Sequence, residues 1–571
     1  MSLLKKKIVI KKKNFIQKQI YLEEYNNDNN STSIHDLIEK KDKFIRKEII
    51  EILNNISKKN KDLLKTLEIY DDFNFWELTN FQEKNLYKKN NYYTIAKIIS
   101  LLDYLKEQEF DSIEIYDENK KIKKLLEKNF PKKKIIYQEI SNKSFIKKIG
   151  FSFHYEIYSI LISFIFILRK FFFKKINKFN IETNKNLFLS FFTYLDEKKL
   201  NQNIYRSSFW GDISTISQSN FLHFFIKNKQ VPNINVAQDK ISKFKDPNIH
   251  MLLDNFCKII VIKNMIKYLI KIKFESYKLK KKIKIEFKNL NLSFFFTEDI
   301  NREFLSYNII IKLYFFFAFE YFFKKYKFQK NCFFTMENQP WEKSLIYHWK
   351  NNNNKKIFGV INSLVRFWDL RFSRSNYLPS KILANGSYSF NNLKEFGYEE
   401  DVLEIVESLR YENSTLVTTN NNSKNILILF DYSESSNERL IEVLNSIQSL
   451  KKFGIFAKFH NLGKVKKGLL RINYEDYNKN INDFRFVICA NKTSAAVDFY
   501  RQGYKIITIK DFNEFNLSPL KNYEECLFVS NSKEIDDCLN SNYEHMGLRH
   551  KNDKFYLINK ELLNWKKILN D

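Results

Sequence analysis

Cysteine is scarce in this chain, and its placement excludes two common kinds of stabilising site. The 571 residues include five cysteines, which are Cys257, Cys332, Cys489, Cys526 and Cys538. Their number is odd, and no two of them form a C-x-x-C pair. The pattern excludes a disulfide framework and a zinc site built on paired cysteines. It favours a reducing compartment, so we expect a cytoplasmic protein.

A long uninterrupted apolar run is also missing. The most apolar stretch, Ile157 to Leu168, is shorter than the ~20 residues that a membrane-spanning helix needs. Near the N-terminus the lysines come too early, and the apolar run is too short, for a secretory signal peptide. We therefore expect neither a spanning helix nor secretion.

Acidic residues are too few to balance the basic ones. The chain has 96 Lys and Arg residues against 66 Asp and Glu residues, which gives a net charge of +30. Part of this excess is explained by lysines on solvated faces, and the rest suggests an anionic partner such as a lipid surface or a phosphorylated small molecule. No recognised nucleic-acid-binding motif is present, so a specific nucleic-acid partner ranks last.

Three segments combine apolar and basic residues. Phe151 to Lys175 has a cationic end, and it is either a helix lying in a membrane interface or a buried helix. Lys258 to Lys288 is either a basic amphipathic helix, attracted to anionic phospholipid by ~1 kcal/mol per surface lysine, or a solvated helix. Phe304 to Phe328 is interrupted by Lys312 and Glu320, which favours a packed helix over a span.

The order of strand-like and helix-like segments predicts two α/β units. Residues 110–140 alternate strand, helix and strand, and a second series of this kind begins at Lys424. Residues 1–65 are charged and Asn-rich, so we expect them to be irregular. Residues 66–385 are expected to form an N-terminal Rossmann-like domain with membrane-facing helical insertions at about 150–175 and 255–328, and residues 386–571 a C-terminal Rossmann-like domain.

The strongest chemical signal is NKTSAAVDFYRQG, residues 491–503, which follows an apolar strand. The strand delivers Asn491, Thr493 and Ser494 to the start of a helix, where free backbone N–H groups and the helix dipole attract phosphate. Asp498 follows one turn later as an acceptor for ribose hydroxyls. The pattern resembles the C-terminal nucleotide-binding half of GT-B glycosyltransferases, although a routine Rossmann-like unit remains the alternative.

A second signal is AKFHN, residues 457–461. It resembles the basic residue, His and Pro loop that follows a strand in many polymerising GT-B transferases. The resemblance implies that Lys458 and His460 contact the donor phosphates or base. Asn461 replaces the usual Pro, and a structural histidine at the strand end is the alternative.

A third signal is the polar turn MENQPWE, residues 336–342, between a strand and a helix. Glu337 is the candidate general base, because a carboxylate partly shielded by Trp341 would have a raised pKa. Asn338 and Trp341 are further candidates for substrate binding. A helix-capping cluster around Glu342 is the alternative explanation.

Two further motifs offer charged side chains. In VRFWDLRFSR, Arg366 and Arg371 are candidates for phosphate binding, because arginine forms bidentate pairs with phosphate. Arg366 paired with Asp369 inside the protein is equally compatible with the pattern. In RSSFWGD, Asp212 is the alternative catalytic carboxylate, or part of a turn packed by Trp210.

Several motifs together resemble a family of bacterial surface-carbohydrate biosynthesis proteins encoded in O-antigen regions. They are RSSFWGD, MENQPWEKSLIYHW, GVINSLVRFWDLR, LPSKILANG and NKTSAAVDFYRQG. The resemblance implies an α/β, GT-B-like fold, with two Rossmann-like domains facing a cleft and extra amphipathic helices. It also implies a cytoplasmic glycosyltransferase, peripheral on the inner face of the membrane, that moves a sugar from a nucleotide to a lipid-linked or growing glycan. The C-terminal half is distantly similar to capsule transferases, which favours a CMP-linked donor, followed by UDP- or GDP-linked sugars.

The expected mechanism needs neither a cofactor nor a metal. No Asp-x-Asp pair lies near the predicted site, and helix dipoles with basic side chains can stabilise a leaving phosphate. Two other functions remain open. One is a nucleotide-sugar epimerase or hydrolase on the same fold, and the other is a non-catalytic scaffold at the membrane surface.

Overall fold

The computed structural model describes residues 6–570, apart from a set of short segments and the side chains of residues 15 and 148–155. Those segments are 13–14, 23–30, 89–90, 118–119, 140–147, 177–178, 180, 328, 353–355, 412–422, 461–462, 464, 466, 478–482, 524 and 541–553. Asn461 of the predicted AKFHN loop therefore lies outside the described residues.

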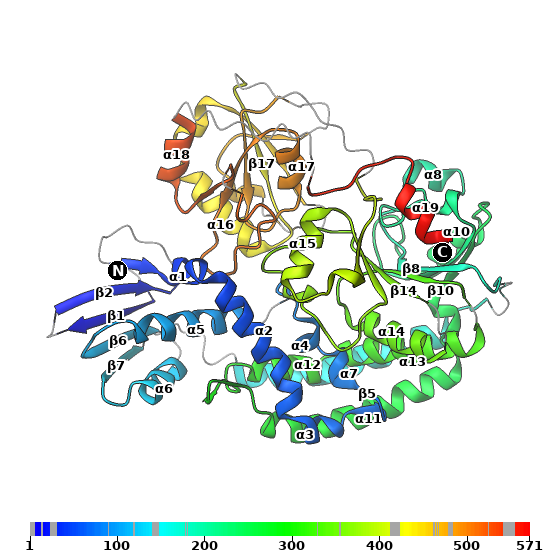
Figure 1. Cartoon of the computed structure of the whole chain (residues 1–571), viewed down its shortest axis with the longest axis horizontal. Helices are drawn as coiled ribbons and strands as arrows, with labels where there is room; N and C mark the ends of the chain where they lie inside the picture. The colour runs from blue at the N-terminus through cyan, green and yellow to red at the C-terminus, as the bar shows by residue number, and fades with distance from the viewer. Residues whose placement is uncertain are drawn as a thin grey trace.

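A mixed sheet opens the chain (Figure 1). Its order is β3-β2-β1-β6-β7, formed by β1 (Lys7–Lys12), β2 (Phe15–Tyr21), β3 (Ser31–Ser33), β6 (Ser112–Asp117) and β7 (Lys134–Glu139). The helices of this unit are α1 (Ile34–Lys40), α2 (Asp42–Lys59), α5 (Tyr92–Lys106) and α6 (Lys120–Asn129). The strand, helix and strand predicted for residues 110–140 are confirmed, because β6 and β7 are parallel and joined by α6.

The expectation that residues 1–65 are irregular is wrong for the described part of that segment. In β1 the consecutive residues Ile8, Val9 and Ile10 are buried, and Ile20 is buried in β2. Along α2, buried residues such as Ile45, Ile49 and others spaced by three or four positions form a helical stripe. The surrounding Lys and Asn residues concealed these short apolar patterns in the sequence.

A parallel seven-stranded sheet forms the centre of the N-terminal half. Its order is β10-β9-β8-β13-β14-β15-β16. The strands are β8 (Asn186–Phe191), β9 (Ser219–Phe224), β10 (Ile249–Leu252), β13 (Cys332–Thr335), β14 (Ile357–Val360), β15 (Lys381–Ala384) and β16 (Leu403–Ile405). Helices α8 (Glu197–Asn201), α9 (Ile213–Ile216), α10 (Ile234–Ser242), α14 (Pro340–Asn352) and α15 (Ser387–Glu395) belong to it. The last helix of the chain, α19 (Leu563–Asn570), returns to this half, where Trp565 donates its indole N–H to the Glu407 carbonyl at 2.9 Å.

Four further helices lie together in the lower half of the molecule in Figure 1. They are α7 (Lys148–Phe172), α11 (Ile259–Lys282), α12 (Thr297–Leu305) and α13 (Asn308–Lys325). The packed helix predicted for residues 304–328 is confirmed by α13, which buries Phe316, Phe319 and Phe322. Among the described residues, no helix is both long enough and apolar enough to cross a bilayer.

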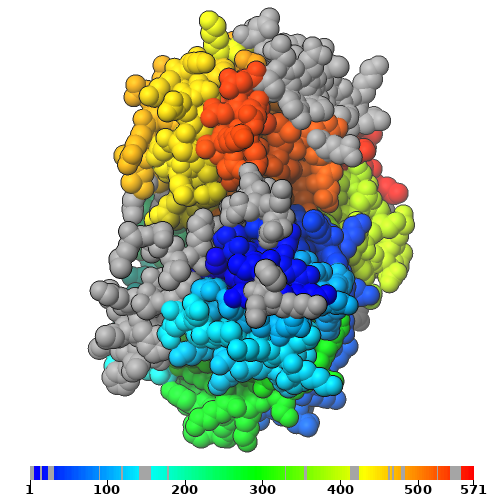
Figure 2. Space-filling model, turned by 90° about the vertical axis from the view of Figure 1, so that its left-hand side faces the viewer, coloured from blue at the N-terminus to red at the C-terminus, as the bar shows by residue number. Residues whose placement is uncertain are grey.

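The C-terminal half is a parallel six-stranded sheet in the order β19-β18-β17-β20-β21-β22. Its strands are β17 (Asn425–Leu429), β18 (Gly454–Lys458), β19 (Glu475–Asp476), β20 (Phe486–Ala490), β21 (Lys505–Ile509) and β22 (Leu527–Val529). Helices α16 (Glu434–Asn445), α17 (Ala495–Arg501) and α18 (Ser532–Asn540) connect them. Figure 2 shows the N-terminal unit, in blue and cyan, between this half, in yellow and orange, and the green helices below.

The two parallel sheets confirm the predicted fold class. Each is a Rossmann-like α/β unit, and together they give the GT-B-like arrangement, to which the mixed sheet and the long helices are added. In each sheet the strand order reverses at one place, between β8 and β13 and between β17 and β20. Ligands of open parallel sheets bind outside the carboxyl ends of the strands at such reversals. The candidate site is therefore sought in the loops that follow these strands.

Candidate active site between the two parallel sheets

The loops at the reversal of the C-terminal sheet form a buried polar cluster. Asp431, just after β17, accepts the backbone N–H of Lys492 at 3.3 Å and that of Ser433. The Lys492 ammonium forms an ion pair with Glu514 and a 3.3 Å hydrogen bond with the Ser433 hydroxyl. Burial raises the pKa of Glu514 to about 7, although Lys492 opposes the rise. The cluster thus places the Lys492 ammonium and the hydroxyls of Ser433 and Ser436 at the carboxyl ends of the strands.

The predicted loop after β20 lies at this same edge. The Asn491 amide donates to the Phe515 carbonyl at 2.8 Å, and Thr493 is buried. Ser494 is the N-cap residue of α17, and its side chain is exposed. Its backbone has right-handed helical angles, and its hydroxyl does not cap the helix. Gly503 has a φ of +90°, which confirms that the helix ends there in a left-handed turn. The exposed hydroxyl of Ser494 is thus available for a ligand at the helix start.

Lys458 is the last residue of β18, and His460 lies in the loop that follows. The Lys458 ammonium lies 5.3 Å from the ring centroids of Tyr477 and Phe499. His460 lies beside Tyr432, with ring centroids 6.0 Å apart. Partial desolvation, and then the positive charge of Arg410, lower the pKa of His460. The same arginine interacts electrostatically with Asp498, so His460, Arg410 and Asp498 share one neighbourhood.

In the N-terminal half, Glu337 lies two residues after β13, at the reversal of the sheet. Its carboxylate accepts the Gln339 amide at 2.9 Å and approaches the Arg371 guanidinium at 3.4 Å, while its side chain remains 36% exposed. Glu342 is buried and accepts the backbone N–H groups of Glu337 and Asn338, each at 2.9 Å. Glu342 therefore caps the turn, which leaves Glu337 as the carboxylate that reaches solvent.

Arg371 links this carboxylate to an aromatic bridge between the two halves. Asp369 holds the guanidinium through two hydrogen bonds of 2.8 and 2.7 Å. The guanidinium carbon lies 4.9 Å from the Tyr87 ring centroid, and the Tyr87 and Tyr432 centroids are 6.0 Å apart. Glu337, Arg371, Tyr87, Tyr432 and His460 thus form a continuous series of neighbours from one sheet reversal to the loops of the other sheet.

Arg366 ties the halves together instead of pairing with Asp369. Its Nη1 donates to the carbonyl oxygens of Lys492 at 2.8 Å and Leu517 at 2.7 Å, and its side chain is buried. The sequence left open an ion pair between Arg366 and Asp369, but the partner of Asp369 is Arg371. Arg366 was predicted to bind phosphate, but both of its described hydrogen bonds go to backbone carbonyls of the other half.

Asp212 lies in a second polar region, near the end of β8. Arg206 donates to the Asp212 carboxylate at 2.7 Å and to Asp196 at 3.3 Å. Arg206 also lines a cavity of about 180 Å³ with Ser207, Ser208 and Arg410, the arginine close to His460. The structure therefore places Asp212 beside a small arginine-lined cavity rather than beside Glu337.

Trp341 and Asn338 face the interior of the N-terminal half. The Asn338 amide donates to the Gln82 carbonyl at 3.3 Å. Trp341 packs against Phe224, with centroids 4.8 Å apart, and donates its indole N–H to Gln339 at 2.9 Å. We expected Trp341 to shield the Glu337 carboxylate. The described hydrogen bonds of that carboxylate instead come from Gln339 and Arg371.

Trp341 and Gln339 instead line a cavity of about 380 Å³. Seven of its sixteen lining residues are aromatic, and the lining includes Phe166 and Lys170 of α7 and Tyr314 of α13. Because Gln339 bonds both to Trp341 and to Glu337, this aromatic cavity adjoins the candidate carboxylate.

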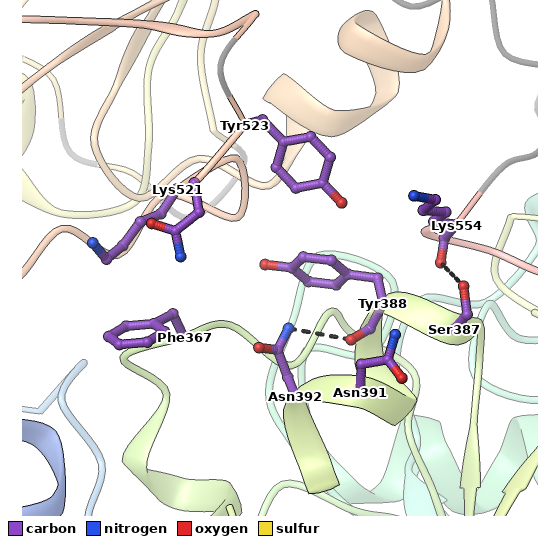
Figure 3. A pocket seen from close by; sticks show the side chains of 9 residues that line it. Phe367, Ser387, Tyr388, Asn391, Asn392, Lys521, Tyr523 and Lys554 are labelled. Atoms are coloured by element: carbon purple, nitrogen blue, oxygen red, sulfur yellow. Dashed lines mark hydrogen bonds between the residues drawn. The ribbon is translucent and has the colours of Figure 1, made fainter. Parts of the chain in front are cut away.

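A further cavity of about 260 Å³ lies where α15 meets the C-terminal half (Figure 3). The Tyr388 ring lies opposite Tyr523, with centroids 6.2 Å apart, and its hydroxyl donates to the Pro519 carbonyl at 2.8 Å. Lys521, which also lines the cavity, is already paired with Glu39 and Asp42. We regard this region as part of the contact between the halves.

Sequence reasoning missed several residues of the site. Asp431, Tyr432 and Ser433 follow the apolar strand β17 in the motif FDYS, so their position after a buried strand was the available signal. Tyr87 and Arg410 carry no motif, since they come from a short helix-connecting segment and from the link between the halves. Among the described residues, no group of three or more His, Cys, Asp or Glu side chains is arranged to hold a metal ion.

Comparisons with known proteins return structural likenesses alone. No family model and no curated protein sequence matches the chain. The UDP-GlcNAc 2-epimerase of Neisseria meningitidis is 9% identical, with a TM-score of 0.35 over 68% of this chain and 99% of that one. The corresponding enzyme of Methanocaldococcus jannaschii is 12% identical, with a TM-score of 0.33 over 53% and 96%. The lipopolysaccharide outer core galactosyltransferase WaaB is 8% identical, with a TM-score of 0.30 over 62% and 89%. Likenesses of this size assign no function to the chain.

Proposed function

We propose that this chain is a glycosyltransferase that binds a nucleotide sugar between its two parallel sheets. It passes the sugar to a lipid-linked or growing glycan at the cytoplasmic face of a membrane, in the assembly of a surface polysaccharide. The observation that carries the proposal is the series of neighbours from Glu337 through Arg371, Tyr87 and Tyr432 to His460. It joins a candidate base at one sheet reversal to a basic loop of the other sheet.

The C-terminal loops supply the donor side of this proposed site. Ser494, with its exposed hydroxyl, and His460 follow the parallel strands β20 and β18, which both pair with β17, and Lys458 is the last residue of β18. Anionic ligands of such sheets bind outside the carboxyl ends of the strands. Arg410 adds a positive charge near His460 and Asp498. Cations and N–H groups fixed before the reaction stabilise the charge that develops on the leaving phosphate. The nucleotide is CMP, UDP or GDP.

The N-terminal half supplies the acceptor side. Glu337 is held in place by Gln339 and Arg371, and its exposed part would accept the proton of the acceptor hydroxyl. The adjoining aromatic cavity of about 380 Å³ would hold the acceptor, since rings such as Trp341 give apolar faces for a sugar or a lipid segment. Asp212, held by Arg206, is the second candidate carboxylate.

An epimerase or hydrolase on the same fold would need no acceptor cavity beside its carboxylate. The aromatic cavity next to Gln339 therefore favours transfer. Incubation of the protein with a nucleotide sugar in the absence of acceptor separates the cases. A transferase leaves the donor largely intact, whereas an epimerase or hydrolase converts it.

Ligand-induced stabilisation tests the donor site directly. A ligand that binds only the native state raises the melting temperature, by an amount that grows with its concentration relative to Kd. We expect one of CMP, UDP and GDP to stabilise the wild-type protein, and S494A/D498A to lose the shift. The matched control S532A/D537A changes the same residue types on α18 and should keep the shift. Equal shifts in both double variants would remove Ser494 and Asp498 from the donor site.

A further inference from the structure

Helix α7 has its polar and apolar sides reversed with respect to an ordinary surface helix. Ser159, Ser163 and Lys170 are buried. The Ser163 hydroxyl donates to the Ser159 backbone carbonyl at 2.8 Å, and Lys170 pairs with Asp254. The outward side is apolar and exposed, with Ile157, Tyr158, Ile160, Leu161, Phe164, Ile165, Leu168, Phe171 and Phe172. A helix facing water places these residue types the other way round.

Helix α11 extends this apolar face. The two helices are in contact, and the Tyr277 hydroxyl on α11 donates to Glu156 on α7 at 2.6 Å. The exposed apolar residues of α11 are Ile259, Ile260, Ile266, Ile270, Phe274 and Tyr277. Fifteen of the twenty-three large apolar side chains exposed in the described part of the chain thus lie on α7 and α11. So strong a concentration marks an interaction surface, because single exposed apolar residues are normally scattered.

Basic residues surround and interrupt the apolar face. On α11 the exposed lysines include Lys263, Lys267 and Lys281, which fall on the same side as Ile270 and Phe274 at helical spacing. Lys175, Lys258 and Lys325 gather near the start of α11, where burial and the two neighbouring charges lower the pKa of Lys258. Burial also lowers the pKa of Lys273 to about 8. Added anions would relieve this crowding of positive charge.

We infer that the face formed by α7 and α11 docks onto the surface of an anionic phospholipid bilayer. Its apolar side chains enter the interface, while its lysines meet the anionic headgroups. A second copy of the chain is a poorer occupant, because two lysine-rich faces would repel each other. The inward side of α7 lines the aromatic cavity, so docking sets that cavity next to the bilayer. This last step rests on the proposed function, because it assigns the cavity to a lipid-linked acceptor.

Vesicle sedimentation tests the docking face with the full chain. The probes are vesicles of phosphatidylcholine alone and vesicles with equal parts of phosphatidylcholine and phosphatidylglycerol. We expect binding to the anionic vesicles, weakened by salt. L161E/F164E should abolish it, and K263Q/K267Q/K281Q should weaken it about fivefold for each lysine near the surface. The controls L469E/L563E and K451Q/K452Q/K533Q change exposed residues of the same types elsewhere.

Three results would overturn the inference. They are no sedimentation of the wild type with anionic vesicles, equal loss in the variants and their controls, or a dimer in solution that L161E/F164E dissociates. Circular dichroism melting curves identify any variant that fails to fold, and the lysine variant then provides the independent test. The stabilisation by nucleotides, measured without lipid, fails only if the proposed donor site is wrong. Failure of docking and failure of the proposed function are therefore separable.

Discussion

Arg366 donates both hydrogens of one guanidinium nitrogen across the boundary between the halves, to the carbonyl oxygens of Lys492 and Leu517. The loop after β14 is thereby fixed to the loop after β20, which begins the proposed donor site. Buried carbonyl groups that lose a charged donor must either find water or remain unsatisfied. Arg366 is thus a positioning residue for the loops that contain Lys492 and Leu517, at the carboxyl ends of the C-terminal strands.

Substitution R366A should lower both the free energy of unfolding and the affinity for nucleotide. Loss of hydrogen bonds from a charged group costs about 1.5–3 kcal/mol for each bond, so we expect a loss of about 3 kcal/mol. Urea unfolding followed by fluorescence measures it. R374A is the matched control, because Arg374 is exposed and lies 3.4 Å from Glu399. A surface pair of this kind contributes about 0–1 kcal/mol. Equal losses of unfolding free energy in R366A and R374A would contradict the proposed role of Arg366 in joining the two halves.

Substitution E337Q should lower kcat by at least about 100-fold and leave nucleotide binding unchanged. Glutamine retains the shape and can still contact Arg371 weakly, but it cannot accept a proton, and general base catalysis contributes about 10²–10⁴-fold. Turnover with acceptor and thermal shift with nucleotide measure the two effects separately. E399Q, on an exposed carboxylate of the same half, is the control. If D212N rather than E337Q abolishes turnover, Asp212 is the base.

Several strands of the two parallel sheets, such as β8, β13, β17 and β20, were readable because each is a short apolar run followed by polar residues. FRFVICANKTS, for example, predicts both β20 and the polar loop that follows it. Asn491, Thr493, Ser494, Lys458 and His460 were predicted as donor ligands for this reason, since position at or after the end of a buried strand is a local property. Strands β1 and β2 of the N-terminal sheet were missed because their short apolar stretches are flanked by lysines and glutamines in a Lys-rich chain.

Contacts between distant segments were beyond the reach of local patterns. Tyr87 meets Tyr432 across 345 positions, and Tyr87 belongs to no motif. Arg366 and Arg371 are five positions apart, yet one bonds to the other half and one holds Glu337. Their roles depend on the turn at residues 370–372, which the sequence did not reveal. Contacts between residues of the two halves could therefore be identified only from the three-dimensional structure.

The pKa of His460 should rise when nucleotide binds. In the unliganded protein, desolvation and Arg410 lower this pKa, because both disfavour the charged imidazolium. A bound phosphate reverses the balance by adding negative charge. Because the complex then holds its proton more tightly than the free protein, nucleotide affinity should increase as pH falls through the pKa of the complex. Titration of ring-labelled histidine by NMR, with and without nucleotide, measures the change. The pH dependence of affinity should disappear in H460Q, and its persistence would place the titrating group elsewhere.

The ion pair of Lys492 and Glu514 allows stability and binding to be separated. K492M alone leaves the buried Glu514 without its cation, and breaking a buried pair costs about 3–5 kcal/mol. K492M/E514Q removes both charges, so it should recover most of that stability, since glutamine can still bond to the Ser436 hydroxyl. If Lys492 helps to attract the nucleotide phosphates, the double variant remains weak in nucleotide binding although it is stable. Calorimetric titration of both variants decides the question. Wild-type affinity in K492M/E514Q would mean that Lys492 serves only to neutralise Glu514, and the donor phosphates would then depend on Lys458, His460 and Arg410.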